Sequence, residues 1–274
     1  MLRTGFGAKT AKSLSSTGGG KQNVSDRGSG ADGVIRSIAG VDMAVWIDIA
    51  DVTGFADGDK VAEWSAKVGT GPAQSDVNKK PLYKDNGFNN RPSLFFDNSN
   101  DCLTWGSNQI NAAGTSATTI VSVSNTSSTS ANSVIFEVGG AYWAGQYAAQ
   151  FYNTSEDAVS AEGPSGAEGT VTATTQKDNV FISAMDRATN PDAIVPYING
   201  EPAAVESETT ANNTNDFLWN TGANLGSRQN GGSLPLNGDI REFLIINRFL
   251  AEDEACRLGK ALMNKCGLTD QYVA

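Results

Sequence analysis

The stretch Val180-Phe181-Ile182-Ser183-Ala184-Met185 decides the fold class, because it is a short run rich in β-branched and aromatic side chains. Such runs are typical of β-strands. A second run, Ile120-Val121-Ser122-Val123-Ser124, alternates apolar with hydroxyl side chains. This alternation is expected when one face of a sheet is buried and the other meets water. We therefore predict an all-β protein.

The same character returns in six further segments on both sides of these two runs. They are Met43–Ile49, Pro92–Phe96, Ser133–Val138, Tyr147–Tyr152, Ile194–Ile198 and Ile240–Ile246. Between them stand Gly, Asn and Asp residues of the kind that turns with positive φ require. About 230 residues of this pattern fit one large antiparallel two-sheet sandwich, over residues 41–274, better than two domains.

One helix is expected near the C-terminus, over residues 249–263. Leu258 and Leu262 share one face of it, acidic residues open it, and basic residues lie toward its end. That order of charge complements the helix dipole. Gly267 follows as a C-terminal stop. We expect this helix to pack across one edge of the sandwich.

Residues 1–40 differ from the rest in composition and charge. They are rich in Gly and Ser, and they carry a formal charge of +4 against −14 for residues 41–274. The cations are Arg3, Lys9, Lys12, Lys21, Arg27 and Arg36. Such a segment buries too little surface to offset its ordering entropy, so we predict an extended arm. Two roles stay open, a flexible linker and a docking arm whose cations meet acidic neighbours in a larger assembly.

Composition excludes several functions. The 274 residues contain no His, which rules out a Ser-His-Asp triad, a Cys-His pair and an HExxH zinc helix. The net charge of −10 argues against a nucleic-acid partner. No apolar run reaches 18 residues, and we recognise no secretion signal, so no membrane partner is expected. Cys102, Cys256 and Cys266 are too scattered for a disulfide framework and are expected to be free thiols.

Four groups of residues carry a resemblance to a known superfamily. In chain order they are Ala44–Asp51 with Asp57–Ser65, Pro81–Tyr83 with Asn86–Asp97 and Asn100–Leu103, Val195–Gly200, and Leu225–Arg228 with Gly238–Leu250. The ordered set resembles the laminin-G-like, or concanavalin A-like lectin-glucanase, jelly-roll superfamily, of the kind found in bacteriophage structural proteins. The resemblance implies a jelly-roll sandwich, with Trp46 and Trp64 at core positions.

The superfamily includes lectins, glycoside hydrolases and surface proteins of bacteriophage particles, so the shared fold does not transfer an activity. We predict a non-enzymatic structural or decoration protein on the surface of a phage head or tail. It would be assembled in the host cytoplasm, anchored to other virion proteins by the arm, oligomeric there, and in contact with host glycans. The alternatives are a carbohydrate-binding module of a bacterial surface protein and a glycoside hydrolase.

Hydrolysis would need two carboxylates about 5–5.5 Å apart, held in retaining glucanases by an E-x-D-x-x-E strand. No such string occurs in the sequence, and Glu137 and Asp186 lack a spaced partner on their predicted strands. We therefore predict no catalytic residues.

Glycan recognition would need exposed aromatic rings beside polar groups. Trp105, Tyr152 and Trp219 are candidates, but the strongest are Tyr142 and Trp143 in a Gly-rich loop, with Tyr147. For any single ring a place in the core is the alternative.

Calcium is the only cofactor that the sequence suggests. Asp97, Asn100 and Asp101 offer hard oxygen ligands at close spacing in the segment 97–101. The same composition also suits a tight turn without a metal ion.

Overall fold

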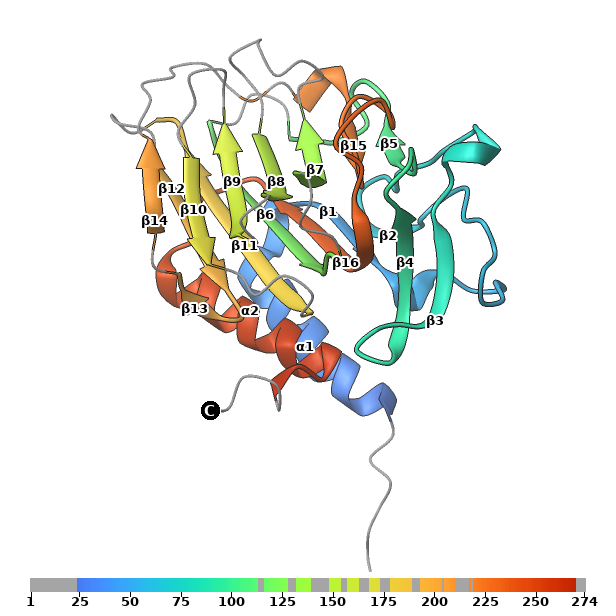
Figure 1. The fold of residues 1–274 in the computed structure, drawn as a ribbon. Coiled ribbons are helices and arrows are strands. Elements are labelled where there is room, and N and C mark those ends of the chain that lie inside the picture. Colours follow the sequence, from blue (N-terminus) through green and yellow to red (C-terminus); the bar gives the residue numbers. More distant parts are fainter. Residues whose placement is uncertain are drawn as a thin grey trace, which may run out of the picture.

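The computed structural model describes residues 24–112, 116–127, 132–138, 148–153, 157–162, 168–172, 178–188, 193–203, 205–209, 217 and 219–269. These residues form two antiparallel β-sheets that face each other, with two helices on one outer side (Figure 1). The predicted all-β sandwich with a C-terminal helix is confirmed. None of the helices in this part of the chain is long and apolar enough to cross a membrane.

The larger sheet contains nine strands in the order β13-β12-β11-β6-β16-β1-β2, with β4 paired to β16 and to β3. Their bounds are β1 (Met43–Asp48), β2 (Ala66–Val68), β3 (Leu82–Phe88), β4 (Arg91–Asp97), β6 (Ala117–Ser124), β11 (Asn179–Asp186), β12 (Ala193–Ile198), β13 (Glu201–Pro202) and β16 (Asn237–Ile246).

The smaller sheet contains seven strands in the order β14-β10-β9-β8-β7-β15-β5. Their bounds are β5 (Leu103–Trp105), β7 (Ser133–Val138), β8 (Ala148–Tyr152), β9 (Asp157–Glu162), β10 (Glu168–Thr172), β14 (Val205–Thr209) and β15 (Ala223–Leu225). All eight strands predicted from the sequence are present in one sheet or the other.

Aromatic rings fill the space between the two sheets. Phe136 of the smaller sheet lies 4.8 Å from Phe243 of the larger one, and Trp105 lies 5.9 Å from Phe243, measured between ring centroids. Trp64 is also buried in this core. Aromatic pairs at these separations add to the free energy gained from burial.

The hydroxyl side chains of β6 correct one expectation. Ser124 was expected to face water, but it is buried and lies 3.3 Å from the Tyr152 hydroxyl, inside the sandwich. Val121 and Val123 point to the opposite face of β6, where they join a second apolar cluster. The alternation does separate the two faces of β6, but both faces are buried.

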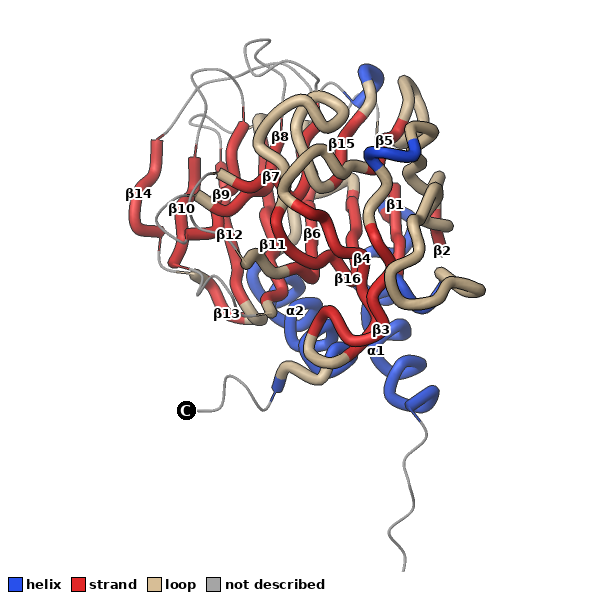
Figure 2. Tube along the Cα trace, turned by 45° about the vertical axis from the view of Figure 1, so that its right-hand side comes forward, coloured by secondary structure: helices blue, strands red, loops and turns tan. Residues whose placement is uncertain are grey.

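Two helices cover the outer face of the larger sheet and enclose that second core. The helix α2 (Glu252–Cys266) is the expected C-terminal helix, and it packs beside α1 (Val24–Ala39). Figures 1 and 2 show both helices on the side of the larger sheet that faces away from the smaller sheet. Leu258 and Leu262 of α2 are buried against this sheet, together with Trp46 of β1.

The helix α1 corrects the prediction of an extended arm over residues 1–40. Residues 1–23 lie outside the described residues, but residues 24–39 are helical and dock on the chain's own body. Ile35 and Ile38, three residues apart, are buried in the second core. Tertiary contact of these two side chains is the physical reason why a Gly-rich segment is ordered there.

Candidate functional site

The outer face of the smaller sheet carries a row of polar side chains on three adjacent strands. Asn224 of β15 pairs with Glu137 of β7 on one side and with Thr104 of β5 on the other. Phe136, next to Glu137, points into the core, so Glu137 points outward from the sandwich. The three polar residues therefore lie side by side on this face.

Arg228 closes over this row from the loop between β15 and β16. Its guanidinium forms an ion pair with the Glu137 carboxylate, which is buried. Burial raises the pKa of Glu137, although the attraction of Arg228 opposes the rise. The second oxygen of Glu137, Oε1, has no hydrogen-bond partner among the described residues. Glu137 is fully buried, so this oxygen lies beneath the surface of the sheet and the exposed part of the site is the loop that carries Arg228.

Asn230, on the same loop, extends the polar surface. Its backbone N–H donates to Asn224 Oδ1 at 3.1 Å, and its own side-chain oxygen accepts from Gln74 Nε2 at 3.0 Å. Asn230 and its neighbour Gln229 are exposed. The loop therefore presents amide donors and acceptors to solvent beside the Glu137–Arg228 pair.

The predicted aromatic residues belong to the connection between β7 and β8. Val138 at the end of β7 pairs with Ala148 at the start of β8. The connecting residues 139–147 include Tyr142, Trp143 and Tyr147, which lie outside the described residues. Because this connection starts directly after Val138, it leaves the sheet next to Glu137. Their role in glycan contact stays a prediction.

The other candidate rings are core residues. Trp105, Tyr152 and Trp219 are buried, so their assignment as glycan platforms is wrong. The Trp105 ring packs against Phe136 and Phe243, and its indole N–H donates to Thr70 O at 2.6 Å. Trp46 and Trp64 are buried, as the resemblance implied.

The segment 97–101 forms a turn that brings two carboxyl groups together. Asp97 Oδ1 accepts the Ser99 N–H at 2.9 Å, and Asp101 Oδ2 accepts the Asp97 N–H at 3.2 Å. Asn98 has φ 62°. Burial and the nearby Asp97 raise the pKa of Asp101 to about 7. The bonds favour the turn role, while two adjacent carboxyl groups with Asn100 are also a hard-oxygen set that suits Ca²⁺, so calcium stays a prediction.

Of the six cations of the predicted arm, the structure describes the side chain of Arg36. Arg36 lies with its guanidinium carbon 4.9 Å from the centroid of the Trp46 ring, a cation–π contact within the chain. Arg27 belongs to α1, but its side chain is not among those described, and Arg3, Lys9, Lys12 and Lys21 lie outside the described residues. Anchoring to virion proteins through these four cations stays a prediction.

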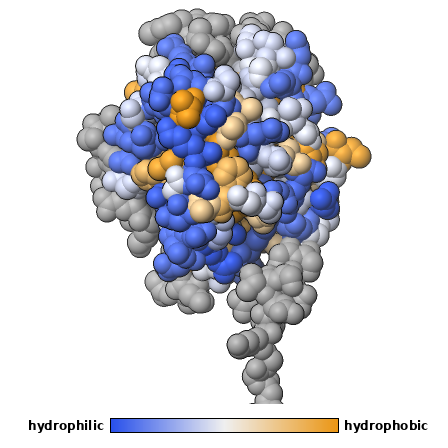
Figure 3. Space-filling model, turned by 90° about the vertical axis from the view of Figure 1, so that its right-hand side faces the viewer, coloured by the Kyte–Doolittle hydropathy of each residue, from blue (hydrophilic) through white to orange (hydrophobic). Residues whose placement is uncertain are grey.

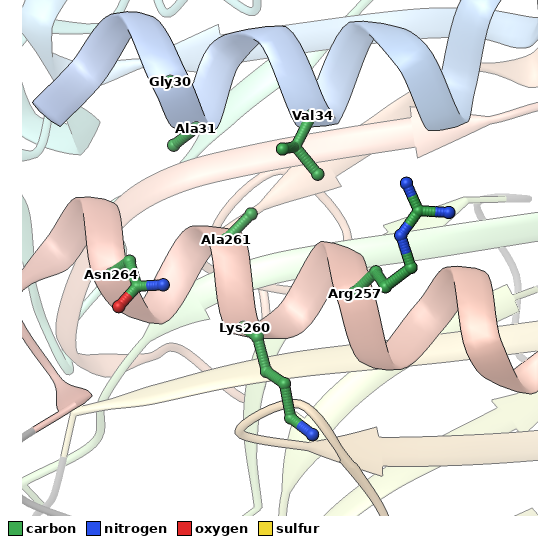
Figure 4. Close-up of a pocket in the computed structure, with 7 residues that line it drawn as sticks. All are labelled: Gly30, Ala31, Val34, Arg257, Lys260, Ala261 and Asn264. Carbon is green, nitrogen blue, oxygen red and sulfur yellow. The ribbon is translucent and has the colours of Figure 1, made fainter.

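Two further surface features stand apart from this site. A groove of about 330 Å³ runs between α1 and α2, with Ala31 and Ala261 on its facing walls (Figure 4). Figure 3 shows a mainly hydrophilic face with apolar groups near its centre, above it and at the right-hand edge. Phe55, one of the exposed large hydrophobic residues of the chain, packs on Tyr83 of β3 with 6.2 Å between ring centroids.

No protein-family model matches the chain, and no curated protein matches its sequence. Solved structures do match. A Trypanosoma rangeli sialidase is 12% identical with a TM-score of 0.55 over 87% of this chain, as is its complex with sialic acid. A CBM40 of a Ruminococcus gnavus IT-sialidase is 16% identical over 74% of this chain and 97% of its own length, with a TM-score of 0.43. The chain shares the sandwich fold of the Trypanosoma structures.

These matches correct the prediction that the chain is not an enzyme, because the structures that share its fold are named as sialidases. The chain spans 38% of the length of the Trypanosoma sialidase chains. At 12% identity the likeness establishes the fold, and the activity named belongs to those proteins.

The site also contains residues that sequence reasoning missed. Arg228 and Asn224 were not singled out as site residues, and Glu137 was considered only as an isolated carboxylate. Arg228 is separated from Glu137 by 91 residues along the chain. Only the strand register, which places Asn224 beside Glu137, could have revealed the group.

Proposed function

We propose that the chain is a carbohydrate-binding domain that holds glycans on the outer face of its smaller sheet. The observation that carries this proposal is the pair of exposed amides, Gln229 and Asn230, on the loop that holds the buried Glu137 through Arg228. A connection with three aromatic residues starts directly after Val138, the residue that follows Glu137 at the end of β7. Sugars are bound by aromatic rings that stack on their apolar faces and by polar groups that bond their hydroxyls. The polar groups lie near the end of β7, where the connection that contains the aromatic residues begins.

Sialylated glycans are the first class to test, because one of the matching sialidase structures is a complex with sialic acid. The rest of the argument does not depend on that choice. Hydroxyl groups common to all sugars would bond the exposed side-chain amides of Gln229 and Asn230. A phage-particle location stays a prediction beside this proposal, and binding to host glycans would be compatible with it.

The test is a calorimetric titration of the whole chain with a sialylated oligosaccharide and with its desialylated form. Tyr142→Ala combined with Trp143→Ala should weaken binding at least tenfold, since each stacked ring contributes on the order of 1 kcal/mol. Phe55→Ala is the matched control, because Phe55 is an exposed ring on another part of the surface. Chromatography of the glycan after incubation separates binding from cleavage.

Two results would overturn the proposal in different ways. Equal binding by the double variant would move the site away from the connection between β7 and β8. Failure of the unaltered chain to bind any member of a broad glycan array would reject carbohydrate binding itself.

A further inference from the structure

The helix α1 has little tendency to be helical by itself. Its sequence VSDRGSGADGVIRSIA contains three glycines, Gly28, Gly30 and Gly33. Each glycine lowers the helical propensity relative to alanine in a helix interior, and isolated helices of this length are marginal even with better residues. Docking on the body therefore holds α1 in its helical form.

The described docking contacts combine ion pairs, a cation–π contact and buried apolar side chains. Asp32 Oδ2 lies 2.9 Å from Lys67 Nζ, and Asp32 Oδ1 lies 2.8 Å from Lys265 Nζ. Arg36 stacks on Trp46, and the side chains of Ile35 and Ile38 are buried beside it. All these contacts come from the second half of the helix.

A groove remains beside the docked helix, between α1 and α2. The groove between α1 and α2 runs along Gly30, Ala31 and Val34 (Figure 4). A Cβ atom added at Gly30 or Gly33 would meet nothing within 4 Å. Gly30 and Gly33 are exposed, so the helix is held through residues 31–39 while a groove stays open beside Gly30, Ala31 and Val34.

We call the charged residues of the body under α1 the acceptor site; they are Asp48, Lys67, Glu242 and Lys265. Their charges stay balanced when α1 is taken away. Lys67 lies 2.8 Å from Asp48, and Lys265 lies 2.7 Å from Asp48 and 2.8 Å from Glu242. The body thus supplies two acids and two amines, and α1 adds one acid, Asp32, and one cation, Arg36. Removal of one partner of a buried pair ordinarily destabilises a protein strongly, because the other charge is left buried and uncompensated. Departure of α1 avoids this penalty because no buried charge loses its last partner.

A short hinge joins α1 to the sandwich. Gly40 has φ 53°, and Val41 is fully exposed. Arg248 holds the chain on both sides of this point, with its Nη2 donating to Ile38 O at 2.6 Å and its Nε 3.2 Å from Asp42 Oδ2. The Ile38 contact requires only that an α1 helix occupies the site, whichever chain supplies it.

We propose that α1 is an exchangeable docking helix, which occupies the acceptor site of a second copy of this chain as well as its own. An exchanged helix remakes every contact that it leaves, so only the hinge differs between the closed and the exchanged forms. The chain then forms reciprocal dimers through Trp46, Lys67 and Lys265. This assembly does not depend on the proposed glycan site.

The first test uses a cysteine pair across the groove, in a Cys256→Ser background to remove the partly exposed natural thiol. Ala31 and Ala261 face each other from α1 and α2 (Figure 4). A full-length Ala31→Cys chain is incubated with a full-length Ala261→Cys chain just below the melting temperature and then oxidised. A covalent dimer of the two different chains on a non-reducing gel is expected. The double variant in one chain is the control, which should close its bond internally. Absence of the dimer when that control closes would overturn the proposal.

A charge exchange decides the question if the cysteine variants fail to fold or the control stays open. An Asp32→Lys chain and a Lys67→Glu chain each repel their own α1, but each accepts the helix of the other. The mixture should give a dimer by light scattering and melt at a higher temperature than either chain alone, because one site then pairs the two introduced side chains with each other and the other restores the Asp32–Lys67 pair. A mixture that stays monomeric and melts like its separate components would reject the exchange.

Discussion

Lys265 Nζ lies 2.7 Å from Asp48 Oδ2, and this buried pair joins α2 to the larger sheet. The oxygens of Asp32, Asp48 and Glu242 lie within 4.8 Å of one another, an arrangement that could also suit a metal ion. The ammonium group of Lys265 contacts all three carboxylates instead. The cluster is therefore a structural ion-pair network that joins both helices to the sheet.

Replacement of the central amine should destabilise the fold strongly. Lys265→Met leaves Asp48 and Glu242 facing each other in a buried site, and loss of one partner of a buried ion pair costs about 3–5 kcal/mol. The free energy of unfolding, measured in urea, should fall by an amount in this range.

A second lysine of α2 provides the control for this variant. Lys260 pairs with Glu201 at 2.7 Å, but both side chains are more than half exposed. Lys260→Met should change the free energy of unfolding by less than about 1 kcal/mol, as exposed pairs usually do. Equal losses in the two variants would contradict the assignment of Lys265 as the buried centre.

Acid should weaken the same network. Burial alone would raise the pKa of Asp48, but the attraction of Lys265 and hydrogen bonds from both lysines outweigh it and lower the pKa from 3.8 to about 2. The folded state therefore favours the charged form, and its contribution of about 2 kcal/mol is present above pH 3.8 and lost as the pH falls through 2. Urea unfolding at a series of pH values should show this decline.

Asp48→Asn separates this decline from general acid denaturation. The variant should be less stable at pH 6 and lose less between pH 4 and pH 2 than the unaltered chain. Glu242 affects stability in a different pH range, because burial raises its pKa to about 7. Its contribution to stability is full below pH 4.5 and is lost as the pH rises through 7. A decline of the same size in the variant would show that other carboxylates cause it.

The strands could be predicted because the side chains within each run favour a strand by themselves, without reference to residues distant in sequence. The run Val180–Met185 in β11 is mainly apolar and combines β-branched with aromatic side chains, and such a run favours a strand whichever element covers it. Which face of a strand is buried is a different question. Ser124 was misplaced because alternation separates two faces but does not say that helices cover one and a second sheet covers the other.

The helix α1 and the polar site could not be predicted in the same way, since both depend on residues distant in sequence. Asp32 pairs with Lys265, and Glu137 pairs with Arg228. Neither acid can be assigned to an ion pair until its distant partner is known. Glycines in α1 lower its helical propensity, so the local signal favoured an arm. Tertiary contacts overrode that signal.

Asp101 should make the fold less stable as the pH rises through neutrality. Its pKa is raised by burial and by Asp97 to about 7, so the folded state holds this proton more tightly than the unfolded chain does. The contribution to stability is full below pH 3.8 and lost as the pH rises through 7. Asp101→Asn keeps the acceptor for the Asp97 N–H and adds a donor for the Asp97 carboxylate.

This variant should therefore melt at a higher temperature than the unaltered chain at pH 8 and at a similar temperature at pH 4. Calcium provides an internal comparison, because a bound ion would stabilise the unaltered chain at pH 8 and would lose a ligand in the variant. A lower melting temperature of Asp101→Asn at pH 8 without calcium would contradict the assigned pKa.

A single alanine should strengthen the docking helix. Gly33 is an exposed residue of α1, and a Cβ added there meets nothing within 4 Å. Gly33→Ala lowers the cost of forming the helix, so the free energy of unfolding should rise by about 1 kcal/mol. Gly87→Ala is the contrasting control, since a Cβ at Gly87 collides with Ser93 Oγ and Asp239 Oδ1. Hydrogen exchange of the α1 amides should slow in Gly33→Ala if helix formation limits their protection. Unchanged exchange and unchanged stability would show that α1 is held by its contacts with Lys67 and Lys265 alone.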